Sequence, residues 1–412
     1  MSRGLRPPAT IFAAWLAVGC GARVLGIASD ASTLDARTDG VIDASVLRDV
    51  FTPRDLAPAD VAHDAGAAPR DVVVDTGTDT GPPCVSGLPC SLGIPACRVG
   101  VTVCGGPLAC APSDVSPYGT PCPTGICDGR GACMAPSQRS CPSASEAGCG
   151  IVNLLGGTFA LGDNGAFRSS PVQRAITVSA FALDASEVTV ARFQRFWAAG
   201  HPAAPSRIAY PGAVVPWSGA VQSPGTGAGC NWNVPGREYH PVNCVDHPTA
   251  QAFCVWDGGR LPTEAEWEFA ARDTLGVGLA AGRSYPWGEA VPSPTCDRAA
   301  WNQCAGDDGG RTHRVGHYMN TAGFFDLAGN VWEWTADLFA GYDDPACWGG
   351  RARTDPYCPR GASGYPAIRG GSWYSGSVTL LRAASRDDAY MPATQSPIVG
   401  LRCARARLVI GG

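Results

Sequence analysis

The feature that most limits how this chain can fold is its cysteine content, 19 cysteines in 412 residues. A reducing cytosol keeps thiols free, so this number indicates an exported protein with disulfide bonds. Ten of the cysteines lie between Cys84 and Cys149, in a stretch otherwise rich in Gly, Pro and Ser. Such a stretch cannot bury a hydrophobic core, so disulfides must hold any fold that it adopts.

Zinc binding is the alternative role for closely spaced cysteines. However, residues 84–149 contain no Cys-x2-Cys pair and no histidine, which structural zinc sites commonly use. We therefore interpret residues 84–149 as a disulfide-rich stalk of one or two small modules. The sequence does not determine which of its cysteines pair with each other.

The N-terminus has the pattern of an export signal. Two arginines precede an apolar run at residues 11–19, which is too short to span a bilayer. The run ends in Leu-Ala-Val-Gly-Cys, which resembles a bacterial lipoprotein cleavage box, so residues 1–20 are expected to be a signal peptide with lipidation at Cys20. An ordinary signal peptide with an incidental cysteine is the alternative. We expect an extracytoplasmic protein of the bacterial cell envelope, held to the outer membrane by its lipid anchor alone.

Residues 21–83 are rich in Ala and Asp and almost free of aromatic residues. So little apolar surface cannot offset the entropy cost of ordering, and the aspartates repel one another. This segment is predicted to be a disordered acidic linker. Its aspartates lack the Asp-x-Asp-x-Asp-Gly spacing of a calcium loop. The formal net charge of the whole chain, -5, argues against nucleic acid as a partner.

From residue 150 onwards aromatic residues and amphipathic patterns begin. The 53 Gly and 35 Pro of the chain indicate a loop-rich protein rather than a helical bundle. A helix predicted after Thr263 opens with a capping box, in which Thr263 and Glu266 satisfy each other's backbone amides. The other predicted elements are strands over 153–163, with a Gly-Gly break, and 175–183, helices over 189–199 and 249–256, a turn at 285–288 and a closing strand over 399–403.

The stretch 324–334 combines two acids, two tryptophans and a Gly-Asn turn. The turn at Gly329 allows main-chain carbonyls to converge on the point that Asp326 and Glu333 reach, and such oxygen ligands suit calcium. Period-two geometry would send the two tryptophans to one face of a strand and Glu333 to the other. The alternative is a buried aromatic strand with one solvated acid.

Several motifs, in this order, resemble the formylglycine-generating enzyme family, also called the sulfatase-modifying-factor domain. The resemblance runs from residue 156 to 407, inside a domain that we place at residues 150–412. Its motifs are residues 157–159, 187–189, 240–242, 261–272, 285–288, 329–334, 369–373 and 400–402. The resemblance implies a variant of the C-type lectin fold, that is, an α+β domain with little regular secondary structure.

The resemblance also implies calcium binding. The implied ligands are the side chains of Asp326 and Glu333 and the carbonyl oxygens of Gly329 and Val331. A second calcium site of the family is left open. Ala299 and Ala300 occupy its first ligand positions, so that Asp307 or Asp308 would have to contribute.

Aerobic members of the family bind Cu(I) through two cysteines that follow a Gly-Gly-Ser motif. In this chain the motif ends at Ser372, and residues 373–381 contain no cysteine. A serine hydroxyl is a hard, neutral ligand with a pKa far above that of a thiol, so it would not hold Cu(I). We therefore expect no bound copper and no catalytic residue, with Ser372 as the only residual match. The iron-binding sulfoxide synthases of the same fold use three histidines, and His313 and His317 show no matching arrangement.

A disulfide between Cys254 and Cys403 is a further implication of the resemblance. The other six cysteines of the domain bracket three short loops, which suggests local pairs. These pairs are Cys230–Cys244, Cys296–Cys304 and Cys347–Cys358. Eight cysteines in the domain and ten in the stalk leave Cys20 as the odd one, as a lipidated cysteine would be.

Two functions are compatible with the sequence. The first is a surface-anchored binding or scaffold module without redox chemistry, whose partner would be an exported protein, a peptide or a glycan. The alternative is an oxidoreductase that converts cysteine to formylglycine in exported sulfatases or related proteins, so whether the chain is an enzyme stays open. A hydrolase that uses Ser372 with His313 or His317 would lack an elbow motif and an acid partner. The fold alone does not name the ligand.

Overall fold

The computed structural model describes most of the chain from residue 89 onwards. The described residues are 89–90, 96–103, 109–135, 137–272, 283–293, 295–302, 304, 311–320, 322–348, 353–361 and 363–407. The predicted signal peptide with Cys20, the predicted linker, and Asp307 and Asp308 lie outside them. The chain divides into two compact units, Met1–Ala68 and Pro69–Gly412, and all described residues belong to the second. Every helix among them is too short or too polar to cross a membrane.

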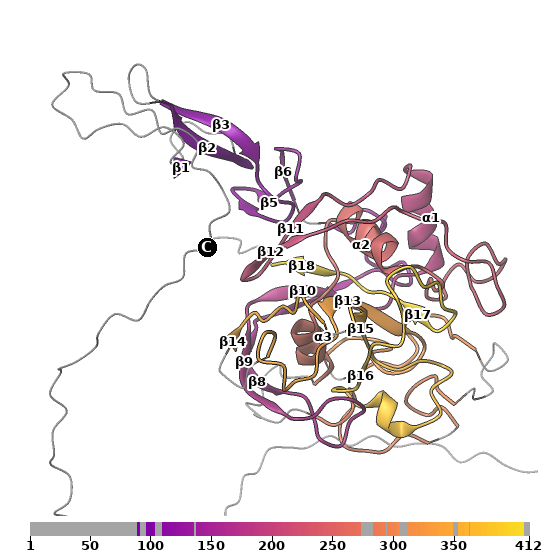
Figure 1. The fold of residues 1–412 in the computed structure, drawn as a ribbon. Coiled ribbons are helices and arrows are strands. Elements are labelled where there is room, and N and C mark those ends of the chain that lie inside the picture. The colour runs from indigo at the N-terminus through magenta and orange to yellow at the C-terminus, as the bar shows by residue number, and fades with distance from the viewer. Residues whose placement is uncertain are drawn as a thin grey trace, which may run out of the picture. The chain divides into compact units, whose positions relative to one another are not determined.

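The described part is an α+β fold with little regular secondary structure, which confirms the expected fold class (Figure 1). Its helices are α1 (Val190–Ala198), α2 (His247–Trp256) and α3 (Glu264–Ala271), with a 3-10 helix, η1, at Val378–Leu381. Its strands form six small sheets. These are β1 (Pro89–Cys90), β2 (Arg98–Val103) and β3 (Ala109–Val115); β4 (Pro121–Cys122), β5 (Gly125–Cys127) and β6 (Cys133–Met134); β7 (Ile151–Leu154), β10 (Phe181–Asp184) and β18 (Ala404–Ala406); β8 (Gly157–Leu161), β9 (Gln173–Val178) and β14 (Arg353–Thr354); β11 (Arg207–Tyr210) and β12 (Ala213–Pro216); β13 (Trp332–Leu338), β15 (Pro366–Arg369), β16 (Arg386–Asp387) and β17 (Val399–Gly400).

Side-chain caps set where the helices begin. Thr189 caps α1 by accepting a hydrogen bond from the amide of Arg192, and the predicted capping box of Thr263 and Glu266 opens α3. Helix α2 begins two residues before the predicted Thr249, because Asp246 accepts from the amide of Thr249 and so acts as its cap. The sequence analysis overlooked this aspartate.

Two predicted strands are each divided in two. The stretch 153–163 forms β7 and β8, and the stretch 175–183 falls in β9 and β10. Because β7 pairs with β10 and β8 with β9, the chain passes between two sheets at each break. At the first break Gly156 has a φ of 74°, and a Cβ there would lie 2.3 Å from the carbonyl oxygen of Val178. Glycine is therefore required at this corner. The predicted closing strand at 399–403 likewise ends with β17, and pairing resumes in β18.

Strand β13 lies between two hydrophobic cores. Its first six residues are buried. Residues of α1 and α2, with Phe193 stacked on Phe253 at 5.4 Å, form one core with its tryptophans. Helix α3 packs against β13, β8 and β9, and its Trp267 and Phe269 belong to the second core (Figure 1). The sheet around β13 thus positions the central stretch 324–334 between the two cores.

The cysteine-rich segment is packed onto the domain. Its described disulfides are Cys97–Cys127, Cys122–Cys133 and Cys141–Cys149. Tyr118 and Ile126 are buried in the same core as α1 and α2. The hydroxyl of Tyr118 donates to the carbonyl oxygen of Val255 at 3.0 Å. A segment that cannot build its own core therefore contributes apolar side chains to a neighbouring one.

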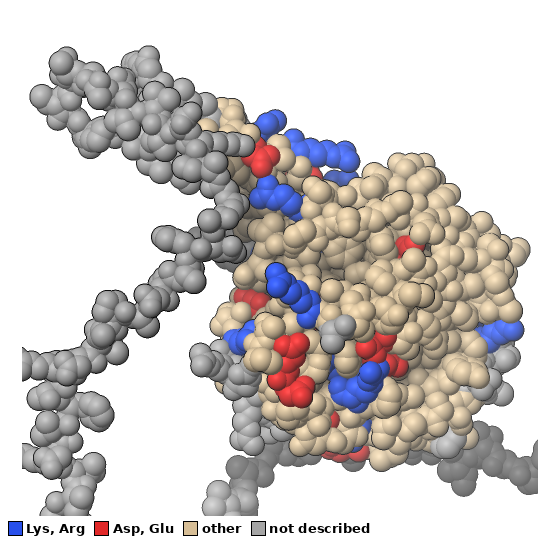
Figure 2. All heavy atoms as spheres, viewed as in Figure 1, with Lys and Arg blue, Asp and Glu red and all other residues tan. Residues whose placement is uncertain are grey.

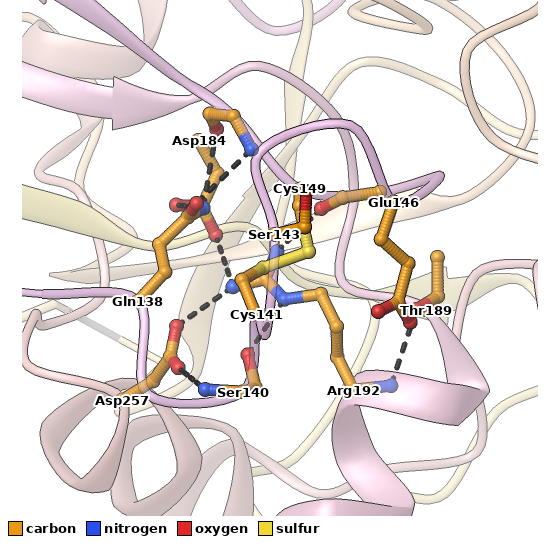
Figure 3. The surroundings of a disulfide bond; sticks show 12 residues. Gln138, Ser140, Cys141, Ser143, Glu146, Cys149, Asp184, Thr189, Arg192 and Asp257 are labelled. Atoms are coloured by element: carbon orange, nitrogen blue, oxygen red, sulfur yellow. Dashed lines mark hydrogen bonds and ion pairs between the residues drawn. A yellow bond between two sulfur atoms is a disulfide. The ribbon is translucent and has the colours of Figure 1, made fainter.

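A buried charge network joins the loop 138–150 to the domain (Figure 3). Arg192 of α1, fully buried, pairs with Asp184 at 3.0 Å and with Asp257 at 2.7 Å. Its remaining donors reach the loop at Ser140 Oγ (2.8 Å) and at the carbonyl oxygen of Gly148 (2.9 Å). The two aspartates also bind Arg405 of β18. Figure 3 shows the disulfide Cys141–Cys149 beside this network.

Charged side chains are sparse on the face of the molecule that Figure 2 shows, and both signs are interspersed on it. This follows from a charged fraction of only 16% and from the burial of many of the charged groups. Arg192, Arg369, Arg386, Arg402 and Arg405 are among the largest fully buried side chains. Each is paired with buried acids, which is the condition for keeping a guanidinium inside a protein.

Candidate functional site

The central stretch forms a tight turn against a neighbouring loop. Asp326 and Asn330 both have a positive φ, of 56° and 58°. The amide of Gly329 donates to the carbonyl oxygen of Gly370 at 2.9 Å. A Cβ at Gly329 would lie 2.2 Å from the carbonyl oxygen of Ala300, so only glycine fits this approach.

The two acids proposed as metal ligands are both buried and have different partners. Asp326 accepts hydrogen bonds from the amides of Gly316 (2.6 Å) and Tyr318 (3.1 Å). Glu333 Oε2 accepts from Trp267 Nε1 and from Arg402 Nε, both at 2.7 Å. The other oxygen, Glu333 Oε1, is buried and accepts no hydrogen bond from any residue that the structure describes. Buried carboxylate oxygens normally have partners, so this atom is an acceptor of the stretch that is still available to a ligand.

Glu187 is a third acid of this centre, and the sequence analysis did not assign it. It accepts from Asn330 Nδ2 at 2.6 Å and from the amide of Val331 at 3.1 Å. Burial raises the pKa of Glu187 well above its usual value, and the nearby charges of Asp326 and Glu333 raise it further. Its place in the motif 187–189 was the available signal.

We call Glu187, Asp326 and Glu333 the carboxylate cluster. Burial also raises the pKa of Asp326. Arg402 pairs with Glu333, and its guanidinium charge acts on all three acids. Three carboxylates facing one guanidinium carry an excess of negative charge when ionised. A hard divalent cation beside Glu333 would neutralise that excess and provide a partner for Glu333 Oε1.

Both faces of strand β13 are buried. Glu333 is 1% exposed, so the alternative of a solvated acid is wrong. Trp334 is fully buried and its Nε1 donates to the carbonyl oxygen of Val245 at 2.9 Å. A strand that lies between two cores buries the side chains on both of its faces. The alternation of side chains along the strand therefore does not distinguish a solvent-exposed face from a buried one.

His247, at the start of α2, is held neutral by the same core. Its ring lies between Trp217 (5.0 Å between ring centroids) and Trp334 (5.4 Å), and its Nε2 donates to the carbonyl oxygen of Thr335 at 2.8 Å. Burial lowers the pKa of His247 from 6.5 to about 4. The unfolded chain therefore takes up this proton at a higher pH than the folded protein does.

Acidification from pH 6.5 to pH 4 should accordingly remove roughly 2–3 kcal/mol of stability through His247. The contribution is complete above pH 6.5 and is lost as the pH falls towards the folded-state pKa. Urea unfolding of the wild type and of His247→Phe across this range measures it as the difference between the two pH slopes. Parallel slopes for the two proteins would show that His247 does not titrate in this way.

The loop after Ser372 is closed by hydroxyl and backbone hydrogen bonds. Ser372 is buried, its amide donates to Ser375 Oγ at 2.9 Å, and its own Oγ accepts from the amide of Tyr374 at 3.3 Å. Ser377 then caps η1 through the amide of Thr379. The serines of this loop therefore stabilise its turn and cap η1 through their hydroxyl groups.

All eight cysteines of the domain form disulfides in the structure. The pairs are Cys230–Cys244, Cys254–Cys403, Cys296–Cys304 and Cys347–Cys358, the same four that the sequence analysis expects. Cys254–Cys403 joins α2 to the segment before β18. His313 and His317 lie in the loop 311–320, which has no helical turn in the structure, with their rings 5.4 Å apart.

Comparisons with known proteins agree with these motifs. A family model, the sulfatase-modifying factor enzyme 1-like domain, matches residues 137–407. The formylglycine-generating enzyme of Streptomyces coelicolor is 33% identical over 293 residues, covering 62% of this chain and 88% of that protein. The inactive C-alpha-formylglycine-generating enzyme 2 of Bos taurus is 35% identical over 172 residues, covering 40% of this chain and 50% of that protein. Among solved structures, PvdO from Pseudomonas aeruginosa matches with a TM-score of 0.46 and 24% identity, over 67% of this chain and 100% of that chain.

Proposed function

This chain belongs to the sulfatase-modifying factor enzyme 1-like domain family, and we propose that it serves as an exported binding or scaffold module without formylglycine-generating activity. The observation that carries the proposal is where the cysteines of the domain lie and how they are paired. Residues 373–381 contain no cysteine, and the domain's eight cysteines are used in disulfides. The domain therefore offers no thiolate pair for a redox metal.

Copper does not fit the residues around Ser372. Cu(I) prefers soft thiolate or thioether ligands, and the polar groups of this loop are hydroxyls and amides such as Ser375 Oγ. These hydroxyls already serve the turn and the cap of η1. A hydroxyl also does not ionise near neutral pH as an activated thiol does, so the loop lacks a nucleophile of the family's kind.

The relatives of this chain include proteins named as enzymes and proteins named as inactive. Several are named formylglycine-generating enzymes, including those of Streptomyces coelicolor and Mycobacterium tuberculosis. Others, in Bos taurus and Mus musculus, are named inactive formylglycine-generating enzyme 2. Proteins named inactive are thus among those similar to this chain, and the oxidoreductase alternative is supported by the relatives named as enzymes.

We also propose calcium as the bound cation, held by the side chains of Asp326 and Glu333 and the carbonyl oxygens of Gly329 and Val331. Calcium would supply structural stabilisation and no redox chemistry. The support for this proposal is that Glu333 Oε1 is buried without a hydrogen-bond partner among the described residues, and that the turn at Gly329 approaches the backbone of Ala300 too closely for any other residue. Lipidation at Cys20 would hold the module at the cell envelope, and its partner would be an exported protein, a peptide or a glycan.

The oxidase alternative predicts turnover that this proposal excludes. The purified domain, loaded with Cu(I) under oxygen, is incubated with a Cys-x-Pro-x-Arg peptide, and mass spectrometry follows the mass loss of aldehyde formation. We expect no aldehyde above the level without protein. The Streptomyces coelicolor enzyme serves as the positive control. Aldehyde formed at a rate that scales with the concentration of this chain would contradict the proposal.

A further inference from the structure

A pocket of about 380 Å³ lies where the cysteine-rich segment meets the domain. Tyr118 and Ile126 line it from the segment, and Phe181 and Tyr210 line it from β10 and β11. None of its lining residues belongs to the carboxylate cluster or to the loop after Ser372. Its volume is in the range of small-molecule sites, which are mostly apolar with a few polar groups.

The walls of the pocket are fixed by hydrogen bonds. The amide of Tyr118 donates to the carbonyl oxygen of Arg207 at 3.1 Å, and the amide of Ala209 donates to the carbonyl oxygen of Tyr118 at 2.6 Å. These bonds join the segment to β11, and the Tyr118 hydroxyl ties it to α2. A cavity held in this way exists before any ligand binds, which lowers the entropy cost of binding.

The charge of the lining has one sign. Its three arginines are Arg260, Arg405 and Arg407, and no acidic residue lines the pocket. Arg260 is paired with Glu266 through both oxygens and lies 4.5 Å from the ring centroid of Tyr210. The guanidinium of Arg405 is likewise engaged with buried aspartates.

Arg407 differs from the other two arginines. Its side chain is half-buried, and it has no ion pair with any described residue. A guanidinium binds a carboxylate through two parallel hydrogen bonds, and it does so most strongly next to apolar surface that excludes water. The pocket thus combines a largely apolar lining with one arginine that has no ion pair among the described residues.

We propose that this pocket binds an apolar group bearing a carboxylate, with Arg407 holding the carboxylate and the lining residues Pro121, Ala180 and Pro211 contacting the apolar part. Both a small free acid and the C-terminus of a peptide have this chemistry. The site is independent of the function proposed above, since it shares no residue with the central stretch or with the loop after Ser372.

Isothermal titration of the exported chain tests the proposal with matched probes. The probes are 3-phenylpropionate and its amide, phenyl phosphate, and the peptide Gly-Gly-Phe with a free or an amidated C-terminus. The acids should bind at least about tenfold more tightly than the amides, because only they form a charge-assisted pair. Binding of the free acid alone identifies a small-molecule site, and tighter binding of the peptide acid identifies a peptide C-terminus.

Two variants locate the binding. Arg407→Gln should lower the affinity for the acids about tenfold and leave the affinity for the amides unchanged. Ala180→Trp should abolish binding of all probes, because exposed Ala180 lines the pocket and a bulky side chain there fills its space. Arg298→Gln, which removes an exposed arginine elsewhere, is the control. Equal melting temperatures of all four proteins establish that each is folded.

Three results would overturn the proposal. One is equal affinity for acids and amides, or no binding of either acid. Another is unchanged acid binding by Arg407→Gln or Ala180→Trp. The third is tighter binding of phenyl phosphate than of 3-phenylpropionate, which would assign the pocket to phosphate esters instead.

Discussion

Replacing Arg192 with methionine should lower the free energy of unfolding by about 3–5 kcal/mol. The substitution keeps much of the side-chain volume but removes a fully buried cation from between Asp184 and Asp257. Among the described residues, those carboxylates would then share Arg405 as their remaining cationic partner. A buried charge without compensation is far more costly than the pair itself is favourable, so the loss is large.

The same substitution should loosen the loop 138–150. Arg192 donates to Ser140 Oγ and to the carbonyl oxygen of Gly148, and the amide of Ser140 donates to Asp257 at 2.6 Å (Figure 3). Hydrogen exchange at these loop amides should therefore accelerate more than exchange in α3, which lies in the other core.

Arg195→Met is the matched control because it removes the same residue type from the same helix. Arg195 has 39% of its side chain exposed, pairs with Glu146 at 2.7 Å and donates to the carbonyl oxygen of Ser140 at 2.6 Å, so it contacts the same loop without being buried. A half-exposed pair of this kind contributes less than about 1 kcal/mol. Denaturant unfolding of both variants gives the comparison. Similar losses for Arg192→Met and Arg195→Met would mean that the buried network does not stabilise the fold as argued.

Local features of this fold were predictable because their causes are local. The capping box at Thr263 involves residues three positions apart, and the cap at Thr189 acts within one helical turn. The loop disulfides such as Cys230–Cys244 close short segments. The pair Cys254–Cys403 closes a long one, and only the resemblance to a family suggested it.

Features that depend on distant residues escaped prediction. The acids around Arg192 lie 8 and 65 positions away in the chain, and a buried arginine looks like a surface residue on a helix whose apolar face is set by Phe193 and Phe196. Glu187 joins Asn330 across 143 positions in the same way. Ion pairs of this kind leave no periodic pattern, so spacing rules cannot find them.

The pattern of the central stretch suggested ligands but not their protein partners. Glu333 Oε2 is taken by Trp267 and Arg402, which come from two other elements. The sequence therefore proposed Glu333 as a ligand, and the structure adds that its Oε1 has no hydrogen-bond partner among the described residues. This distinction decides which substitution tests the proposed cation most directly.

Saturating calcium should raise the free energy of unfolding by about 3–4 kcal/mol when its concentration is 100 to 1,000 times the dissociation constant. The gain arises because the cation binds the folded carboxylate cluster and has no such site in the unfolded chain. Unfolding is measured in a chelator, in calcium and in magnesium. Magnesium should have a smaller effect, since it requires a near-ideal octahedral shell and dehydrates reluctantly.

Glu333→Gln should remove the calcium-dependent increment, because it takes away the charge of the group that carries the open oxygen. Its stability in chelator must be measured separately, since the pair with Arg402 is weakened as well. Glu238→Gln, at an exposed acid, should keep the full increment. A calcium effect of equal size in all three proteins would place the cation elsewhere, and no effect in the wild type would contradict calcium binding at the carboxylate cluster.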